Sequence, residues 1–355
     1  MPAMPVGPQC ITPAWLSDVL EADVRGCDVE QIAIGVGLLG RLFRVRLDGA
    51  PDLPASVVVK LPTLDQQARS ALCEDLEFYL REVTFYREIG LANPLPPARP
   101  YFAAIDEATH DFVLVLDDLS RLRRADQTIG CTAEDAEAVI DGIASHHAHW
   151  WDNERLRSLP WLQTYSTPAF AAIAIGNYEA GWPVALDRVG SGLSPAVRRF
   201  GERLPSLMPW LLAEFARPPM TFLHGDLRLD QLFFAVTADD PPVTALDWQI
   251  TAKGRGAYDV AYFITQSLAT DVRRGCEDGL VGHYAECLAE RGIDYPVEEL
   301  RRDYRLTTAS CFLYPIIAAG RIDIANDRQL ELLRCMLDRA AAAVEDHDCL
   351  ALRPD

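Results

Sequence analysis

The chain has 355 residues, of which 49% are hydrophobic, and a formal net charge of −19. The apolar content excludes a disordered or fibrous protein, and the acidic balance argues against a nucleic-acid partner, because phosphate binding needs basic surface. At about 150 residues per domain, this length predicts about two domains.

Cysteine usage and the apolar stretches indicate where the protein works. The nine cysteines are an odd number without a Cys-x-x-Cys pair, which favours reduced thiols over a disulfide framework or a paired-cysteine zinc site. The first ten residues lack the basic and apolar segments of a signal peptide. The apolar run over 309–320 is too short to span a bilayer. We therefore expect a cytoplasmic protein without a membrane partner.

The first third of the chain predicts strands and one helix. Alternating and β-branched residues indicate the strands, and apolar residues at helical spacing, with Gly90 as a stop, indicate the helix. Together these elements predict a small α+β unit over residues 1–119. The expected strands cover 30–35, 41–47, 55–61, 100–106 and 111–119, and the helix covers 71–90.

Helices dominate the expected second unit, residues 120–355. Thr132 and Asp135 form a capping-box pattern that opens a helix running to about Trp151. A short hairpin is expected over 231–249, with a turn rich in Asp and Pro. Residues 177–190 mix aromatic residues with loop formers and are predicted to be a lid or pocket segment.

Three glycines, Gly35, Gly37 and Gly40, satisfy the pattern G-x-G-x-x-G. A dinucleotide-binding turn would be followed by a helix, and a Walker A loop would continue with Lys and then Ser or Thr. Here the alternating segment 41–47 predicts a strand. The glycines therefore form either a turn that covers nucleotide phosphates or an ordinary glycine-rich hairpin.

Lys60 ends a strand that reads as buried, where an unpaired ammonium would be costly. Glu82 is the preferred partner because it lies beside the apolar stripe of the expected helix, and Glu77 is the alternative. The competing interpretation is that Lys60 extends to solvent from the strand end.

The segment 222–234 reads FLHGDLRLDQLFF. Asp226 is the candidate base for a hydroxyl proton, Arg228 is placed to neutralise charge on a phosphoryl group, and Gln231 offers an amide oxygen to a metal. The alternative is an ordinary turn, because a tripeptide as short as His-Gly-Asp can occur by chance.

Two further aspartates follow the hairpin. Asp247 is expected to chelate magnesium, or else to be an ordinary aspartate at a turn. Asp259 is expected to cap the following helix or to brace the loop around Asp226.

In this order, the motifs resemble those of the aminoglycoside phosphotransferase and choline kinase superfamily, in the branch of ecdysteroid-kinase-like enzymes. HGDLRLDQ resembles its H-G-D-x-x-x-x-N signature, LDWQ stands where protein kinases have Asp-Phe-Gly, and ASHHAHWW is similar to a Leu-His-Ala-x-x-Trp helix. The resemblance covers about residues 32–268. It implies a protein-kinase-like, two-lobed α+β fold with a small β-rich N-lobe and a larger, mostly helical C-lobe.

The resemblance also implies roles for individual residues. Lys60, held by Glu82, would bind the phosphates of ATP under the glycine turn, and backbone groups from Asp117 to Leu119 would hold adenine. Asp226 would be the catalytic base, Asp247 would bind Mg²⁺, and His147 would pack under the catalytic loop. The acceptor would be a hydroxyl of a small molecule, such as an aminoglycoside, a choline-like alcohol or a steroid.

Gln231 departs from the family pattern, which has Asn. The amide oxygen is kept, but one methylene adds roughly 1.5 Å of reach, while Mg²⁺ demands octahedral ligands at about 2.0–2.1 Å. Since Lys60, Asp226 and Asp247 are all present, an active or slowed kinase is favoured over a non-catalytic, nucleotide-binding pseudokinase. A Rossmann-type oxidoreductase is the weaker rival, and it fails if a strand follows Gly40.

Overall fold

The structure is a computed structural model that describes residues 2–33, 40–64, 69–70, 76–321 and 327–354. Gly35 and Gly37 lie outside the described residues, so only Gly40 of the glycine motif is placed. The fold divides into two compact units, of which the first contains Met1–Arg123 and Thr244–Ile250 and the second contains the remainder. The expected division at residue 119 makes each unit one continuous stretch of sequence. In the structure, Thr244–Ile250 belongs to the first unit, although it lies far along the chain.

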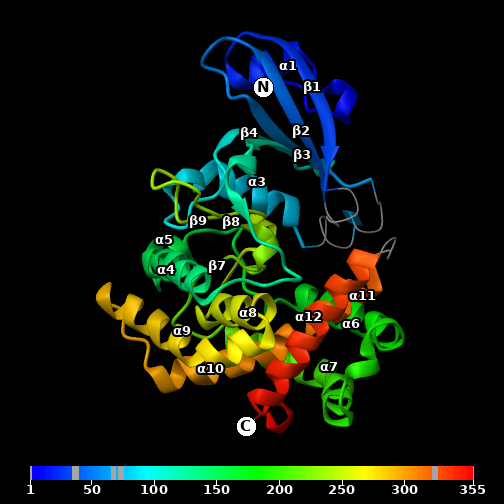
Figure 1. Cartoon of the computed structure of the whole chain (residues 1–355), viewed down its shortest axis with the longest axis vertical. Coiled ribbons are helices and arrows are strands. Elements are labelled where there is room, and N and C mark those ends of the chain that lie inside the picture. The colour runs from blue at the N-terminus through cyan, green and yellow to red at the C-terminus, as the bar shows by residue number, and fades with distance from the viewer. Residues whose placement is uncertain (1, 34–39, 65–68, 71–75, 322–326, 355) are drawn as a thin grey trace. The chain divides into compact units, whose positions relative to one another are not determined.

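The first unit is built on a five-stranded sheet with the order β1-β2-β3-β5-β4, in which every neighbouring pair is antiparallel (Figure 1). A strand follows Gly40, as expected, and this observation excludes a Rossmann dinucleotide turn. The strands are β1 (Val24–Ile32), β2 (Gly40–Gly49), β3 (Ser56–Pro62), β4 (Pro100–Asp106) and β5 (Asp111–Asp117). The helices are η1 (Pro8–Cys10), α1 (Pro13–Leu20), α3 (Phe78–Glu88), η3 (Gly90–Ala92), η4 (Leu119–Arg121) and η7 (Trp248–Ile250).

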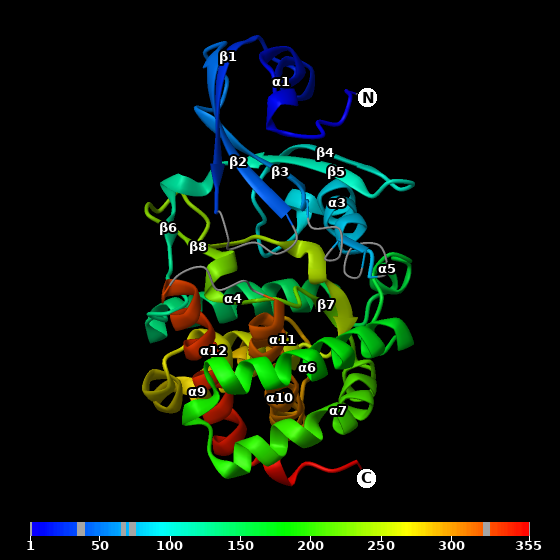
Figure 2. The ribbon, with the colours of Figure 1, turned by 90° about the vertical axis from the view of Figure 1, so that its right-hand side faces the viewer.

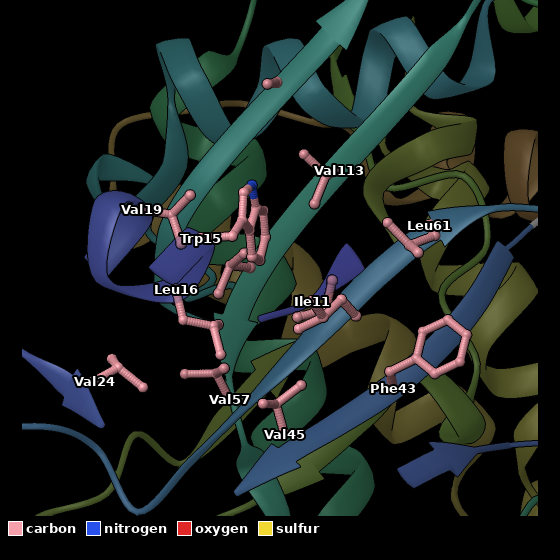
Figure 3. Close-up of a cluster of buried hydrophobic side chains, with 13 residues drawn as sticks. Ile11, Trp15, Leu16, Val19, Val24, Phe43, Val45, Val57, Leu61 and Val113 are labelled. Carbon is pink, nitrogen blue, oxygen red and sulfur yellow. The ribbon is translucent and has the colours of Figure 1, made fainter. Parts of the chain in front are cut away.

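The N-terminal helix α1 covers one part of this sheet. Thr12 caps it, and Pro13 occupies its first turn. Its buried residues Trp15 and Leu16 join a cluster with strand residues such as Val45 and Val57, as Figure 3 shows. No sequence pattern predicted this helix, because its apolar residues span only two turns.

The second unit is mostly helical, as predicted (Figure 2). Thr132 caps α4 through the N–H of Asp135, which confirms the capping-box prediction. The helices are α4 (Ala133–Trp150), α5 (Glu154–Arg157), α6 (Pro168–Arg188), η5 (Gly190–Gly192), α7 (Pro195–Phe215), η6 (Leu229–Gln231), α8 (Ala257–Ser267), α9 (Thr270–Glu290), α10 (Val297–Cys311), α11 (Leu313–Arg321), α12 (Asp327–Asp346) and η8 (Cys349–Ala351). The short strands are β7 (Thr221–Leu223), β8 (Leu232–Phe234), β10 (Ala252–Gly254), and, at the junctions between units, β6 (Arg123–Arg124) and β9 (Val243–Ala245).

Most of the predicted lid or pocket segment, 177–190, belongs to helix α6. Its Gly181 serves close packing instead: a Cβ there would lie 2.3 Å from the carbonyl oxygen of Ile316 on α11. Two helices can approach so closely only where one of them lacks a side chain. Glycine therefore marked a helix contact rather than a loop.

The described helices include none that is both long and apolar enough to cross a membrane. No disulfide joins any two of the eight described cysteines.

Leu16 offers a test of how much α1 contributes to the first unit. Its side chain is fully buried, so Leu16→Ala is expected to lower the free energy of unfolding by about 2–5 kcal/mol through lost burial and a residual cavity. Leu91, which is 60% exposed, supplies the control: Leu91→Ala should change stability by less than about 0.5 kcal/mol. Urea denaturation of both variants measures the difference, and equal stabilities would show that α1 does not anchor the sheet.

Candidate active site

Lys60 is buried between two carboxylates of the first unit. Its Nζ lies 2.8 Å from each carboxylate oxygen of Glu82 and 2.7 Å from Oδ1 of Asp247. The predicted pair with Glu82 is therefore confirmed, and the alternatives of Glu77 or a solvent-exposed lysine are wrong. Glu77 precedes α3 in a left-handed conformation, whereas Glu82 is on the buried face of the helix.

The turn that carries Asp247 is attached to the first unit by backbone and ring contacts. Ala245 donates its N–H to the carbonyl oxygen of Pro96, at 2.9 Å. The ring of Trp248 stacks on Phe85 of α3, with centroids 4.2 Å apart and planes inclined by 9°. Asp247 itself has φ of 65°, a left-handed conformation that aspartate tolerates better than most residues. These contacts bring a residue distant in sequence beside Lys60.

The three charges of this cluster do not cancel. Burial lowers the pKa of Lys60, but the attraction of Asp247 and Glu82 outweighs burial and raises that pKa, so the ammonium stays charged. Burial raises the pKa of Glu82 to about 7 even against the attraction of Lys60. Two carboxylates share one ammonium, and the cluster therefore carries an excess of negative charge when all three groups are ionised.

Gly40 lies against Lys60 in the sheet. Strands β2 and β3 pair Leu42 with Lys60. A Cβ on Gly40 would come within 2.9 Å of Cε of Lys60. Asp117 ends β5 and Leu119 begins η4, so the expected adenine-binding stretch follows the sheet directly.

In the second unit, a buried aspartate fixes the backbone of the His-Gly-Asp loop. Asp259 accepts hydrogen bonds from the N–H groups of His224, at 2.7 Å, and Gly225, at 2.9 Å. His147 lies 3.2 Å from the same carboxylate, and its other ring nitrogen lies 2.8 Å from the hydroxyl of Tyr284. The expected bracing role of Asp259 and the packing role of His147 are both confirmed, whereas Asp259 does not cap α8.

The carboxylate of Asp226 is held by three side chains. Its Oδ1 accepts from the hydroxyl of Tyr262, at 2.7 Å, and from Nε of Arg228, at 3.3 Å. Its Oδ2 accepts from Nε2 of Gln231, at 3.3 Å. Arg228 also donates to Asp230 at 2.7 Å. Although burial opposes its charge, Asp226, Tyr262 and Asp230 raise the pKa of Arg228, which stays cationic.

The predicted site residues therefore form two clusters. Lys60, Glu82 and Asp247 meet in the first unit, and Asp226, Arg228 and Gln231 meet in the second. Tyr262, which directly contacts Asp226, was not predicted from the sequence. A signal was present, since Tyr262 follows Asp259 by one helical turn and shares its face of α8.

A protein-family model matches part of the sequence. Residues 195–293, which include the His224–Gln231 loop, match the model of the ecdysteroid kinase-like family. No curated protein matches the sequence significantly.

Solved structures share the fold over nearly the whole chain. A candidate aminoglycoside phosphotransferase from Ralstonia eutropha is 18% identical, with 95% of this chain and 97% of that chain covered and a TM-score of 0.56. A choline kinase from Cryptosporidium parvum is 10% identical, with 96% and 93% covered and a TM-score of 0.54. An aminoglycoside 2′-phosphotransferase in complex with GDP is 13% identical, with 94% and 95% covered and a TM-score of 0.51. The predicted resemblance and the kinase-like α+β fold are confirmed.

The brace under the loop can be tested through Asp259. In Asp259→Asn, one carboxylate oxygen becomes an NH₂ donor that faces a backbone N–H or His147, so a buried hydrogen bond is lost. We expect the free energy of unfolding to fall by about 1–3 kcal/mol. Denaturant unfolding should detect this loss, while the exposed Asp271→Asn on α9 should leave stability unchanged. Equal stabilities for the two variants would contradict the bracing role.

Proposed function

We propose that this chain, which has the fold of aminoglycoside phosphotransferases and choline kinases, is an ATP- and Mg²⁺-dependent kinase of a small-molecule alcohol. Small-molecule phosphotransferase activity agrees with the family match and with the structural neighbours. The identity of the nucleotide, the metal and the acceptor belongs to the proposal.

The observation that carries the proposal is the buried Lys60–Glu82–Asp247 cluster. A lysine enclosed by two carboxylates is expensive as a purely structural device, because replacing such a cluster by apolar residues often stabilises a protein. The arrangement is well suited to phosphate binding: Glu82 holds the ammonium in place, and the N–H that Asp247 now accepts becomes available to a phosphate oxygen once Asp247 releases it. Asp247, whose side chain is 23% exposed, can release Lys60 and bind a metal ion instead.

The predicted metal ligands have the chemistry that Mg²⁺ prefers. Asp247 and Gln231 offer carboxylate and amide oxygens, the hard donors this ion prefers, and the excess negative charge of the Lys60 cluster favours a cation. The buried hydroxyl of Tyr86, whose pKa is raised by burial and by the nearby charges of Glu82 and Asp247, has no hydrogen-bond partner among the described residues. An orphaned buried hydroxyl of this kind agrees with a hydrated ion bound nearby. Mg²⁺ would supply charge neutralisation of the transferring phosphoryl group.

Asp226 would accept the proton of the acceptor hydroxyl. Tyr262 and Arg228 both donate to Oδ1, so Oδ2 is the oxygen better placed to take that proton. The hydrogen bonds fix the rotamer of Asp226 before the acceptor binds, and such orientation of a base is a main source of rate in these reactions. Arg228, already cationic and next to Asp226, would stabilise negative charge on the phosphoryl group.

The competing function is that of a non-catalytic pseudokinase that binds nucleotide. A screen for ADP release separates the two, with aminoglycosides, choline-like amino alcohols and sterols as acceptors, and with ATP and GTP each tested with and without Mg²⁺. Turnover with any acceptor supports the kinase. The pseudokinase is supported if nucleotide binds without Mg²⁺ and no acceptor is phosphorylated with either nucleotide.

Asp226→Asn tests the assignment of the base. Loss of a general base costs about 100- to 10,000-fold in rate, so we expect phosphotransfer to fall within this range while the Kd for ATP, measured by calorimetry, stays the same. Asp239→Asn, at an exposed position of the β8–β9 turn, is the matched control and should keep the rate. A rate unchanged by Asp226→Asn would refute the assignment.

Gln231 is tested by the Mg²⁺ dependence of the rate. Gln231→Ala should raise the Mg²⁺ concentration for half-maximal activity at least about tenfold, the loss typical when a group that supports a metal site is removed. Gln231→Asn, with the shorter amide that the family carries, should lower that concentration. If both variants share the Mg²⁺ dependence of the parent chain, Gln231 acts only through its hydrogen bond to Asp226.

A further inference from the structure

Three side chains of different chemistry converge on the surface of the second unit, away from the loop of Asp226 in sequence. His283 and Cys287 lie one turn apart on α9, and Asp141 faces them from the neighbouring helix α4. Nε2 of His283 lies 2.7 Å from Oδ1 of Asp141 and 3.6 Å from Sγ of Cys287. Sγ of Cys287 lies 3.4 Å from the same oxygen.

This geometry is not that of a nucleophilic triad. In a Cys-His-Asp triad the acid orients one ring nitrogen and the thiol lies at the other. Here both the carboxylate and the sulfur approach Nε2, and the distance from Sγ to Nδ1 is longer, at 4.0 Å. The three potential ligand atoms therefore point to a common centre rather than forming a relay.

The spacings resemble those of a tetrahedral zinc site. With bonds of about 2.3 Å to sulfur and about 2.1 Å to nitrogen and oxygen, tetrahedral angles place sulfur about 3.6 Å from each of the other atoms and nitrogen about 3.4 Å from oxygen. The observed 3.6 Å and 3.4 Å to sulfur agree with this geometry. Only the hydrogen-bonded N···O pair, at 2.7 Å, must open by about 0.7 Å, and the exposed Asp141 side chain can make this movement.

We propose that Asp141, His283 and Cys287 form a zinc-binding site with a water molecule as the fourth ligand. Thiolate and imidazole donors select Zn²⁺ over the hard Mg²⁺ of the proposed phosphotransfer reaction. Zinc forms a bond to Sγ as the thiol loses its proton to solvent, and the resulting charges of Cys287 and Asp141 balance those of the ion. The half-exposed His283 and the exposed Asp141 leave the site open to water, whereas Cys287 is 6% exposed.

The bound ion would join the two helices that support the loop of Asp226. Besides Asp141, α4 carries His147, and besides His283, α9 carries Tyr284. His147 and Tyr284 are hydrogen-bonded to each other, and His147 contacts the Asp259 carboxylate that holds the loop. Zinc would thus stabilise this helix pair without taking part in phosphotransfer.

Cobalt(II) replaces zinc in such sites and reports on its ligands by absorption. Titration of the tag-free, chelator-treated full chain with CoCl₂ should give a sulfur-to-cobalt charge-transfer band and the visible bands of tetrahedral cobalt, saturating at one equivalent. ZnCl₂ should displace cobalt and so remove the charge-transfer band and the visible bands. Added to the metal-free protein, ZnCl₂ should raise the Tm by about 2–4 °C at saturation. An equal concentration of MgCl₂ should have neither effect.

Matched variants distinguish this site from adventitious binding. Cys287→Ser should abolish the charge-transfer band. The control is Cys276→Ser on the same helix, where the thiol donates a hydrogen bond to the carbonyl oxygen of Val272; this variant should keep the band. Asp141→Asn, at an exposed position that folding tolerates, should weaken cobalt affinity at least about tenfold. The absence of the band in the parent chain, its survival in Cys287→Ser, or unchanged affinity in Asp141→Asn would overturn the proposal.

Discussion

The ion cluster around Lys60 is the constraint on which the first unit depends. An ammonium that is almost fully buried needs compensating charge, and Glu82 and Asp247 supply it from a helix and from a turn distant in sequence. To bring these groups together, α3 must pack on the sheet, and the turn of Asp247 must be held to α3, which the stack of Trp248 on Phe85 achieves. The helix, the sheet and the inserted turn are therefore coupled through one charged centre. Replacing a buried ion cluster by apolar residues is often neutral or stabilising, so stability alone does not account for this one.

The second unit is organised around the orientation of one carboxylate, that of Asp226. Asp259 holds the backbone of the loop through two N–H groups, and Tyr262 holds the side chain of Asp226 from the same helix. One helical turn thus fixes both the path of the loop and the rotamer of the proposed base. The support continues behind Asp259 through His147 to Tyr284, on the helices that carry the proposed zinc ligands. A change in this helix pair would reach Asp226 through hydrogen bonds rather than through loose loop contacts.

Several features were predictable because their signals are local. The strands of the first sheet follow from alternating and β-branched residues, and the start of α4 follows from Thr132 and its hydrogen bond to Asp135. The cost of burying a lone charge predicted a partner for Lys60 if its strand end is buried, and the place of Glu82 beside the apolar stripe favoured it over Glu77. Residues 177–190 show the limit of local signals: they contain glycine and proline, yet most of them form helix α6, and Gly181 allows α6 to approach α11. Composition alone does not distinguish a glycine needed for a turn from one needed for a contact.

By itself, the sequence determined which chemical groups are present and in what order: a lysine at a strand end, a glutamate on a helix, and aspartates at two turns. Order along the chain restricts the fold because each motif has a local conformation of its own. Tertiary structure alone decided that Asp247 shares Lys60 with Glu82, that Tyr262 and Gln231 both hold Asp226, and that Asp141 meets His283 and Cys287. Apart from the contact between Gln231 and Asp226, these contacts join residues far apart in sequence, and their distances depend on how helices and strands pack. No local pattern encodes that packing.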